Sequence, residues 1–311
     1  MTKQKSTFTI VSMLLIYVIW GATFSVMKVG IEYIPPLTFS SLRFIIGGAL
    51  LVLFGIVVRT PFPAKEDWGA LAILGLFQTT FTFSLVFYAM QFVEAGLTAI
   101  LMYTYPLLVN LMAHFLLPGE RLNTRKVIGL LVGFSGLILI FAANANTAGG
   151  WGTVGKVLIL FAALSWAGAT IYLRRRFQNH NTLQVTAWQM LLGGVFTIVP
   201  AFLFERTASF NFNLIAWETL LFASILASAL AFALWFYVLD RLGVGRASVF
   251  LFLVPVCGVV FATFLLKEPF TLRVLGGMLS VAAGIWLVNA GGGQELGQPV
   301  MTPYDSAKSL E

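Results

Sequence analysis

Charged residues are scarce in this chain. Asp, Glu, Lys and Arg make up only 10% of its 311 residues, whereas 59% of the residues are hydrophobic. A soluble domain carries about 25% charged residues, so this sequence cannot cover the surface of a soluble fold. The natural solvent for such a chain is a lipid bilayer.

Cysteine and histidine are rare as well. The chain has one cysteine, Cys257, and two histidines, His114 and His180. A single cysteine forms no disulfide framework, and so few thiols and imidazoles do not supply a Cys/His metal cluster. We therefore expect no metal site and no cofactor.

Long apolar runs dominate what is present. A membrane-spanning helix needs about 20 mostly apolar residues. Lys3 and Lys5 precede the first run as in a signal peptide, but that run is long and lacks a small-x-small cleavage site, so we interpret it as a span. The pattern predicts an all-α polytopic membrane protein. Its ten expected spans are residues 10–31, 37–58, 69–91, 95–117, 124–142, 153–173, 183–204, 215–239, 245–266 and 271–290.

The basic residues predict how these spans are oriented. With the N-terminus inside, thirteen of the 19 Lys and Arg residues fall in inner segments, five fall in outer segments, and Arg43 lies within a span. The positive-inside rule then puts both termini in the cytoplasm, and we expect a multi-pass protein of a bacterial inner membrane. The basic residues are spread over six segments, so we expect no nucleic-acid partner. The expected partners are the lipid bilayer and a small-molecule substrate. The oligomeric state stays open, and a monomer is compatible with the sequence.

The fourth and ninth spans share one pattern. Pro106 and Pro255 are 149 residues apart, and so are Phe115 and Phe264, so the two stretches align without a gap. Further matches at offsets of 146 to 149 connect other pairs of spans. The second half of the sequence therefore looks like a copy of the first.

Each copy holds five spans, an odd number, so the second copy enters the membrane from the opposite side. The sequence predicts two inverted five-helix repeats, residues 1–147 and 148–290, followed by a disordered cytoplasmic tail, residues 291–311. Inverted repeats are typical of alternating-access transporters, whose site lies near the midplane between the halves.

The repeat and three short motifs carry a family resemblance. Trp20-Gly-Ala-Thr-Phe24, Arg43-Phe44 and Pro118-Gly-Glu120 resemble motifs of the EamA branch of the drug/metabolite transporter superfamily, over residues of about 10–290. The resemblance implies a basket of spans 1–4 and 6–9 around a central cavity, with spans 5 and 10 peripheral. It also implies export of amino acids or other small metabolites, as in the ten-span aromatic amino-acid exporters of the YddG type.

Polar and aromatic side chains inside the spans are the candidates for a substrate cavity. Polar groups in hydrocarbon are costly, so they should face a cavity or another helix. Two tryptophans lie mid-helix at matching positions, although tryptophan usually lies at the membrane interface. Packing between helices remains the alternative for these residues. The cavity candidates are Trp20, Gln78, Thr82, Tyr103, Tyr105, Trp166, Ser228 and Trp235.

The fourth span combines polar residues with a proline. On a helical wheel Tyr103, Asn110 and His114 fall on one line. We expect Asn110 and His114 to form hydrogen bonds between helices and Tyr103 to line the cavity. Pro106 and Pro255 are expected to break or hinge their helices, because proline removes a backbone donor.

Few charged residues lie within the predicted spans. Lys28 and Arg43 fall toward the expected outer side, with Glu32 and Glu94 at a similar depth. A structural ion pair is one interpretation, and an outer-vestibule site for a substrate carboxylate is the other. No Asp or Glu falls mid-membrane, which disfavours proton-coupled antiport of cationic drugs, although His114 can in principle titrate.

The function expected from the sequence is export of small metabolites, with amino acids, including aromatic ones, as the first substrates. An exchanger of phosphorylated sugars or nucleotide sugars is one alternative, and it would need Arg43 or Lys28 deep in the cavity. Proton-coupled efflux of drugs and amphipaths is another. An intramembrane enzyme or a scaffold is disfavoured, because no catalytic constellation and no large soluble surface is visible.

Overall fold

The structure is a computed structural model of the whole chain, and it describes residues 3–93, 95–141, 150–205, 210–258 and 272–289. These residues form helices and connecting turns, without a strand among them. The elements are α1 (Lys3–Gly30), α2 (Pro36–Val57), η1 (Lys65–Asp67), α3 (Trp68–Gly75), η2 (Leu76–Phe81), α4 (Thr82–Ala89), α5 (Ala95–Met102), α6 (Tyr105–Leu116), α7 (Thr124–Phe141), α8 (Gly150–Arg176), α9 (Thr182–Phe204), α10 (Leu214–Leu221), η4 (Phe222–Leu230), α11 (Ala231–Leu242), α12 (Val244–Phe250) and α14 (Leu272–Asn289).

Eight stretches of helix in the described residues are long and apolar enough to cross a membrane. They coincide with the predicted spans 1–4, 6–8 and 10, so the prediction of an all-helical chain built for a bilayer is confirmed. α7 occupies the predicted fifth span. Val244–Gly258 is a shorter apolar helix at the start of the predicted ninth span, and residues 259–266 of that span lie outside the described part of the chain. The same holds for the predicted repeat boundary at 147–148 and for the tail.

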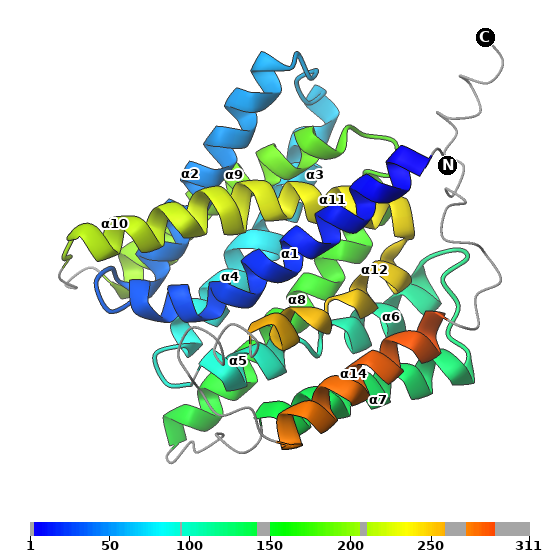
Figure 1. Cartoon of the computed structure of the whole chain (residues 1–311). Helices are drawn as coiled ribbons and strands as arrows, with labels where there is room; N and C mark the ends of the chain where they lie inside the picture. Colours follow the sequence, from blue (N-terminus) through cyan, green and yellow to red (C-terminus); the bar gives the residue numbers. More distant parts are fainter. Residues whose placement is uncertain (1–2, 94, 142–149, 206–209, 259–271, 290–311) are drawn as a thin grey trace, which may run out of the picture.

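The helices α2 and α9 lie side by side (Figure 1), and they pack closely through glycines. A Cβ atom on Gly48 would lie 2.5 Å from the backbone nitrogen of Leu191, and one on Gly194 would lie 2.7 Å from that of Ile45. Because both contacts are with backbone atoms, no side chain can move aside to make room. Small residues let membrane helices approach in this way, and the glycine pairs in these spans serve packing.

Glu205, just after α9, caps the start of α2. Its carboxylate accepts hydrogen bonds from the backbone N–H groups of Leu37 and Thr38, at 2.6 and 2.8 Å, and from the Thr38 hydroxyl at 2.8 Å. The first N–H groups of a helix have no partner within the helix, and a negative charge is favourable there. The cap therefore joins the end of α9 to the beginning of α2.

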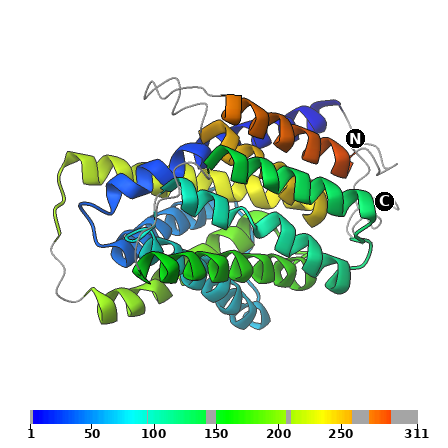
Figure 2. The same ribbon diagram turned by 90° about the horizontal axis from the view of Figure 1, so that it is seen from below.

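α7 and α14 lie side by side at the edge of the bundle (Figures 1 and 2). A Cβ atom on Gly136 would lie 2.6 Å from the carbonyl oxygen of Gly277. The Ser280 hydroxyl donates to the carbonyl of Val132 at 2.8 Å. α7 and α14 are the predicted spans 5 and 10, and their place at the edge agrees with the arrangement that the resemblance implies.

The fourth predicted span is broken before its proline. α5 ends at Met102, residues 103 and 104 form a turn, and Pro106 lies in the first turn of α6. The chain repeats this order later: α12 ends at Phe250, residues 251 and 252 form a turn, and helix resumes before Pro255. Proline is tolerated in a first helical turn because its missing N–H would have no partner there.

Asn110 and His114, two polar residues of α6, form hydrogen bonds to neighbouring segments. The Asn110 amide donates to the Ser248 hydroxyl of α12 at 2.9 Å and to the carbonyl of Pro106 at 2.8 Å. His114 Nδ1 accepts from the backbone N–H of Leu122, in the connection after α6, at 3.1 Å. Asn110 thus forms the expected bond between helices, whereas His114 stabilises a loop.

Candidate functional site

A small cavity lies inside the bundle, and several predicted residues meet there. Its wall comes from α1, α2, α4, α8 and α11 and from the junction of α5 with α6. The lining residues are Trp20, Thr23, Phe24, Met27, Arg43, Phe83, Val86, Met102, Tyr103, Trp166 and Phe232. The open space is about 40 Å³, enough for a few water molecules, whereas sites for small ligands measure about 300–1,000 Å³. The side chains fill the site and have to separate before a metabolite can enter.

One face of α1 supplies a third of the wall. Trp20, Thr23, Phe24 and Met27 all line the cavity, at positions i, i+3, i+4 and i+7 of one helix. This spacing is that of a single helical face. Of these four residues Trp20 was a predicted cavity residue, and the helical period applied to it would have found the other three.

Arg43 is the charged residue of the cavity wall, and its side chain is buried. Its Nε–H donates to the Ser228 hydroxyl at 2.7 Å, and one Nη1–H donates to the Met27 sulfur at 2.9 Å. The guanidinium carbon lies 4.5 Å from the ring centre of Phe44 and 5.1 Å from that of Phe83, which is cation–π geometry. Among the described residues no carboxylate pairs with it; Glu94, one of the acids considered for an ion pair, lies outside them.

Aromatic rings surround the cavity. Trp20 contacts Trp166, Phe232 and Trp235, with ring centres 5.9, 5.3 and 5.9 Å apart. Trp166 also stacks on Tyr105, at 4.4 Å and an interplanar angle of 23°. Edge-to-face and offset contacts of this kind stabilise aromatic clusters beyond their buried area. The result is a continuous aromatic wall.

Three of the predicted cavity residues contact the lining residues from outside the cavity. The Tyr105 hydroxyl is 3.2 Å from that of Thr170 on α8. Ser228 holds Arg43, and Trp235 packs against Trp20. Together they position the residues that line the cavity without lining it themselves.

Gln78 and Thr82 are buried but do not line the cavity. The Thr82 hydroxyl donates to the carbonyl of Phe77 at 2.8 Å, within its own span. The amide nitrogen and oxygen of Gln78 have no hydrogen-bond partner among the described residues. Polar side chains on a membrane helix thus mark buried positions here, and only some of them face the cavity.

Two π-helical segments interrupt the predicted third and eighth spans, and their carbonyl groups bind side chains. In η4, the carbonyl of Ala227 accepts from Trp20 Nε1 at 3.1 Å. In η2, the carbonyl of Phe77 accepts from the hydroxyls of Thr82 and Ser165, both at 2.8 Å. π-helical turns are rare overall, and those that occur are often found at functional sites. Here one of them fixes the ring of Trp20.

Lys28 does not line the cavity. Its ammonium group donates to the backbone carbonyl of Met90, and at 3.5 Å to that of Val93, both just after α4. A cation near a helix C-terminus is favourable because of the helix dipole. Lys28 and Arg43, which the sequence put at a similar depth, therefore occupy different environments.

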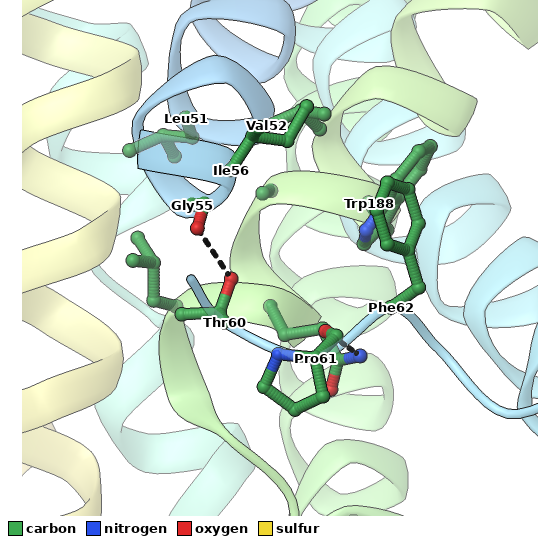
Figure 3. Close-up of a pocket in the computed structure, with 11 residues that line it drawn as sticks. Leu51, Val52, Gly55, Ile56, Thr60, Pro61, Phe62 and Trp188 are labelled. Carbon is green, nitrogen blue, oxygen red and sulfur yellow. Dashed lines mark hydrogen bonds between the residues drawn. The ribbon is translucent and has the colours of Figure 1, made fainter. Parts of the chain in front are cut away.

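Two further hollows lie away from the predicted residues. Figure 3 shows the first, beside the end of α2, where the Thr60 hydroxyl donates to the carbonyl of Gly55 and Phe62 packs against Trp188. Its open volume is about 10 Å³. The second is an apolar groove of about 560 Å³ between η2, α6 and α8, whose rim includes exposed rings such as Phe161. Exposed apolar side chains on spanning helices are suited to contact with lipid.

Comparisons with known proteins give a matching family model and related transporters. A model of the EamA-like transporter family matches residues 7–142 and 153–290. The uncharacterized transporter YoaV of Bacillus subtilis is 34% identical over 270 residues, which cover 86% of this chain and 92% of that protein. A probable amino-acid metabolite efflux pump of Salmonella typhimurium is 26% identical, over 88% of this chain and 92% of the pump.

A solved structure shares the fold. It matches with a TM-score of 0.77, at 22% identity, and the match covers 91% of this chain and 98% of that one. At this identity the likeness concerns the fold.

Proposed function

The chain belongs to the EamA-like transporter family, and on that premise we propose that it exports small metabolites, with aromatic and other apolar amino acids as its first substrates. As a member of this family the chain is a multi-pass membrane transporter. The proposal adds the substrate, the direction and the mechanism. It assigns the protein to the bacterial inner membrane with both termini in the cytoplasm.

The observation that carries the proposal is the composition of the cavity wall. Trp20, Tyr103 and Trp166 supply flat apolar surface, and Arg43 supplies one positive charge. A wall of aromatic rings with few polar groups suits a flat or apolar body that carries one charged end. The name of the Salmonella relative, an amino-acid metabolite efflux pump, points to the same class of solute.

The mechanism that we propose is alternating access. Residues 1–147 and 148–290 would form two inverted repeats that rock around the cavity, with Pro106 and Pro255 at the breaks of their helices. The two breaks, each ahead of its proline, and the small volume of the cavity support this view. A site that is closed around itself has to open toward one side at a time to exchange its content with water.

The alternative functions would need other charged residues in the cavity wall. An exchanger of sugar phosphates would need several cations to hold a dianion, and Arg43 is the cation that lines the cavity in the described part of the chain. A proton-coupled exporter of cationic drugs would need an acid facing the cavity, and neither Asp nor Glu is among the lining residues.

Flux into proteoliposomes tests the proposal. Purified protein should accelerate uptake of labelled phenylalanine or leucine over protein-free liposomes. Trp166→Ala and Tyr103→Ala should each lower the initial rate by about tenfold, because one aromatic contact contributes about 1.5 kcal/mol beyond its area. Trp286→Ala is the matched control, since Trp286 is exposed on the peripheral helix α14 and should leave the rate unchanged. No flux of any amino acid, or wild-type flux in both cavity variants, would contradict the proposal.

A further inference from the structure

We propose that Arg43 is the binding site for the carboxylate of the substrate, and that the cavity selects monocarboxylates over neutral and cationic analogues without requiring an α-amino group. The inference deepens the proposed function and rests on it for the location of the site. It goes further because it defines which end of the solute is recognised and which end is not.

The hydrogen bonding of the Arg43 guanidinium is incomplete. Arginine presents five N–H donors in a planar fork. Two of them have acceptors in the described part of the chain, the Ser228 hydroxyl and the Met27 sulfur. Three N–H groups are left, in a side chain that is only 1% exposed and that lines the cavity. A donor set of this kind is completed by an acceptor that enters the cavity.

The positive charge of Arg43 also favours an anion as its partner. A buried guanidinium inside a membrane is costly unless an anion or a cavity compensates it. Here the compensation comes from a hydroxyl, a thioether and the faces of Phe44, Phe83 and Phe87, all of them weaker partners than a carboxylate. Arg–carboxylate pairs are often bidentate and are among the strong hydrogen bonds in proteins. A carboxylate would take up the free N–H groups and neutralise the charge at once.

The rest of the cavity wall is largely apolar. Apart from Arg43, and from Thr23, whose hydroxyl donates to the Ile19 carbonyl of its own helix at 2.7 Å, the lining residues are aromatic side chains, methionines and Val86, with the Tyr103 hydroxyl and the tryptophan N–H groups as their polar atoms. No acid is present among them to bind an ammonium group, and Arg43 repels one at close range. The amino group of an amino acid would therefore contribute little, and the matching acid without it should bind at least as tightly.

The test uses four probes with the same phenyl group and similar chain length. They are 3-phenylpropionate (anion), 3-phenylpropanamide (neutral), 3-phenylpropylamine (cation) and phenylalanine (zwitterion). Binding to the full-length protein in lipid nanodiscs is followed by intrinsic tryptophan fluorescence, because Trp20 and Trp166 line the cavity. The propionate should bind about 10-fold to 100-fold more tightly than the amide, as a charged hydrogen-bonded pair predicts. The amine should bind more weakly than the amide, and phenylalanine no more tightly than the propionate.

Variants assign the selectivity to Arg43. In Arg43→Met, which keeps a long flexible side chain, the propionate and the amide should bind within about twofold of each other. Arg43→Lys keeps the charge but loses the fork, so it should retain part of the preference. Arg121→Gln is the control, because Arg121 is exposed in the connection between α6 and α7, and it should bind all four probes as the wild type does.

Each outcome decides the proposal. Equal affinity of the wild type for propionate and amide, no propionate binding at millimolar concentration, or undiminished selectivity in Arg43→Met would overturn it. The comparison of probes on the wild type needs no variant, so it decides the proposal even if Arg43→Met fails to fold. Selective binding without any flux in liposomes would contradict export but not the carboxylate site. Amino-acid flux without anion selectivity would contradict the carboxylate site but not export.

Discussion

A single substitution at Ser228 measures how much its hydrogen bond to Arg43 contributes to stability. Its hydroxyl accepts the Nε–H of Arg43 at 2.7 Å, and both side chains are buried. Ser228→Ala removes this acceptor and leaves the guanidinium with the Met27 sulfur, a weak acceptor. Ser224→Ala is the matched control. Ser224 lies in the same segment η4 and is equally buried, but its hydroxyl donates to the Leu220 carbonyl within its own span, at 2.7 Å.

Two estimates of the energy of this hydrogen bond differ. Hydrogen bonds between membrane helices contribute about 0.6 kcal/mol on average, because groups that lose a partner find another one. A bond to a charged group contributes about 1.5–3 kcal/mol. The second figure should apply to Ser228, since Arg43 is charged and its surroundings are mostly aromatic rings. We expect Ser228→Ala to lower the free energy of unfolding by about 1.5–3 kcal/mol and Ser224→Ala by less than about 1 kcal/mol.

The assay is reversible unfolding in mixed micelles with increasing SDS. A double-mutant cycle with Arg43→Met isolates the pair: once the guanidinium is gone, Ser228→Ala should cost less than about 0.5 kcal/mol. Equal losses for Ser228→Ala and Ser224→Ala would refute the reasoning. So would a coupling energy between Arg43 and Ser228 below about 0.5 kcal/mol, which would mean that the guanidinium finds another acceptor.

Two further changes test the packing of α2. Gly48→Ala puts a methyl group 2.5 Å from the backbone nitrogen of Leu191 and should cost about 1–3 kcal/mol in the same unfolding assay. Gly69→Ala, with no atom within 4 Å of the new Cβ, should be neutral or stabilising, and an equal loss at both glycines would contradict close helix packing as the cause. Glu205→Gln keeps the shape of the cap on α2 but removes its charge, and should cost about 0.5–2 kcal/mol. An unchanged free energy of unfolding in Glu205→Gln would show that the charge of the cap contributes nothing.

Much of the fold could be predicted from the sequence. Apolar runs of spanning length locate helices without reference to their neighbours, because each one satisfies its own backbone in lipid. The breaks at residues 103–104 and 251–252 were less accessible. The two prolines indicated that something interrupts each span, but a helical wheel carried across the turn had aligned Tyr103 with Asn110 and His114, which belong to the next helix.

The cavity was predictable in part. Trp20, Tyr103 and Trp166 line it, whereas Gln78 and Thr82 do not. A hydroxyl that binds a carbonyl of its own helix leaves the same sequence pattern as one that faces a cavity. The position of Arg43 depends on which helix faces it and on how the helices cross. Counting residues from the end of a span gives only its depth, so it predicts neither of these.

The π-helical segments η2 and η4 have a consequence for the lengths of the spans that contain them. The offset of 149 that relates Pro106 to Pro255 maps residues 76–81 onto 225–230, inside η4. A π-helical turn holds more residues than an α-helical one, so each of these spans contains residues that a regular helix of the same height would lack. Removing that extra residue would leave a regular α-helical turn with the residues after it in place. Removing a residue from the α-helical part of either span would instead turn everything after it by about 100° and carry Phe83 or Phe232 off the cavity wall. Among related sequences, alignment gaps inside η2 or η4 would therefore preserve the site, whereas gaps elsewhere in these two spans would report a change of site.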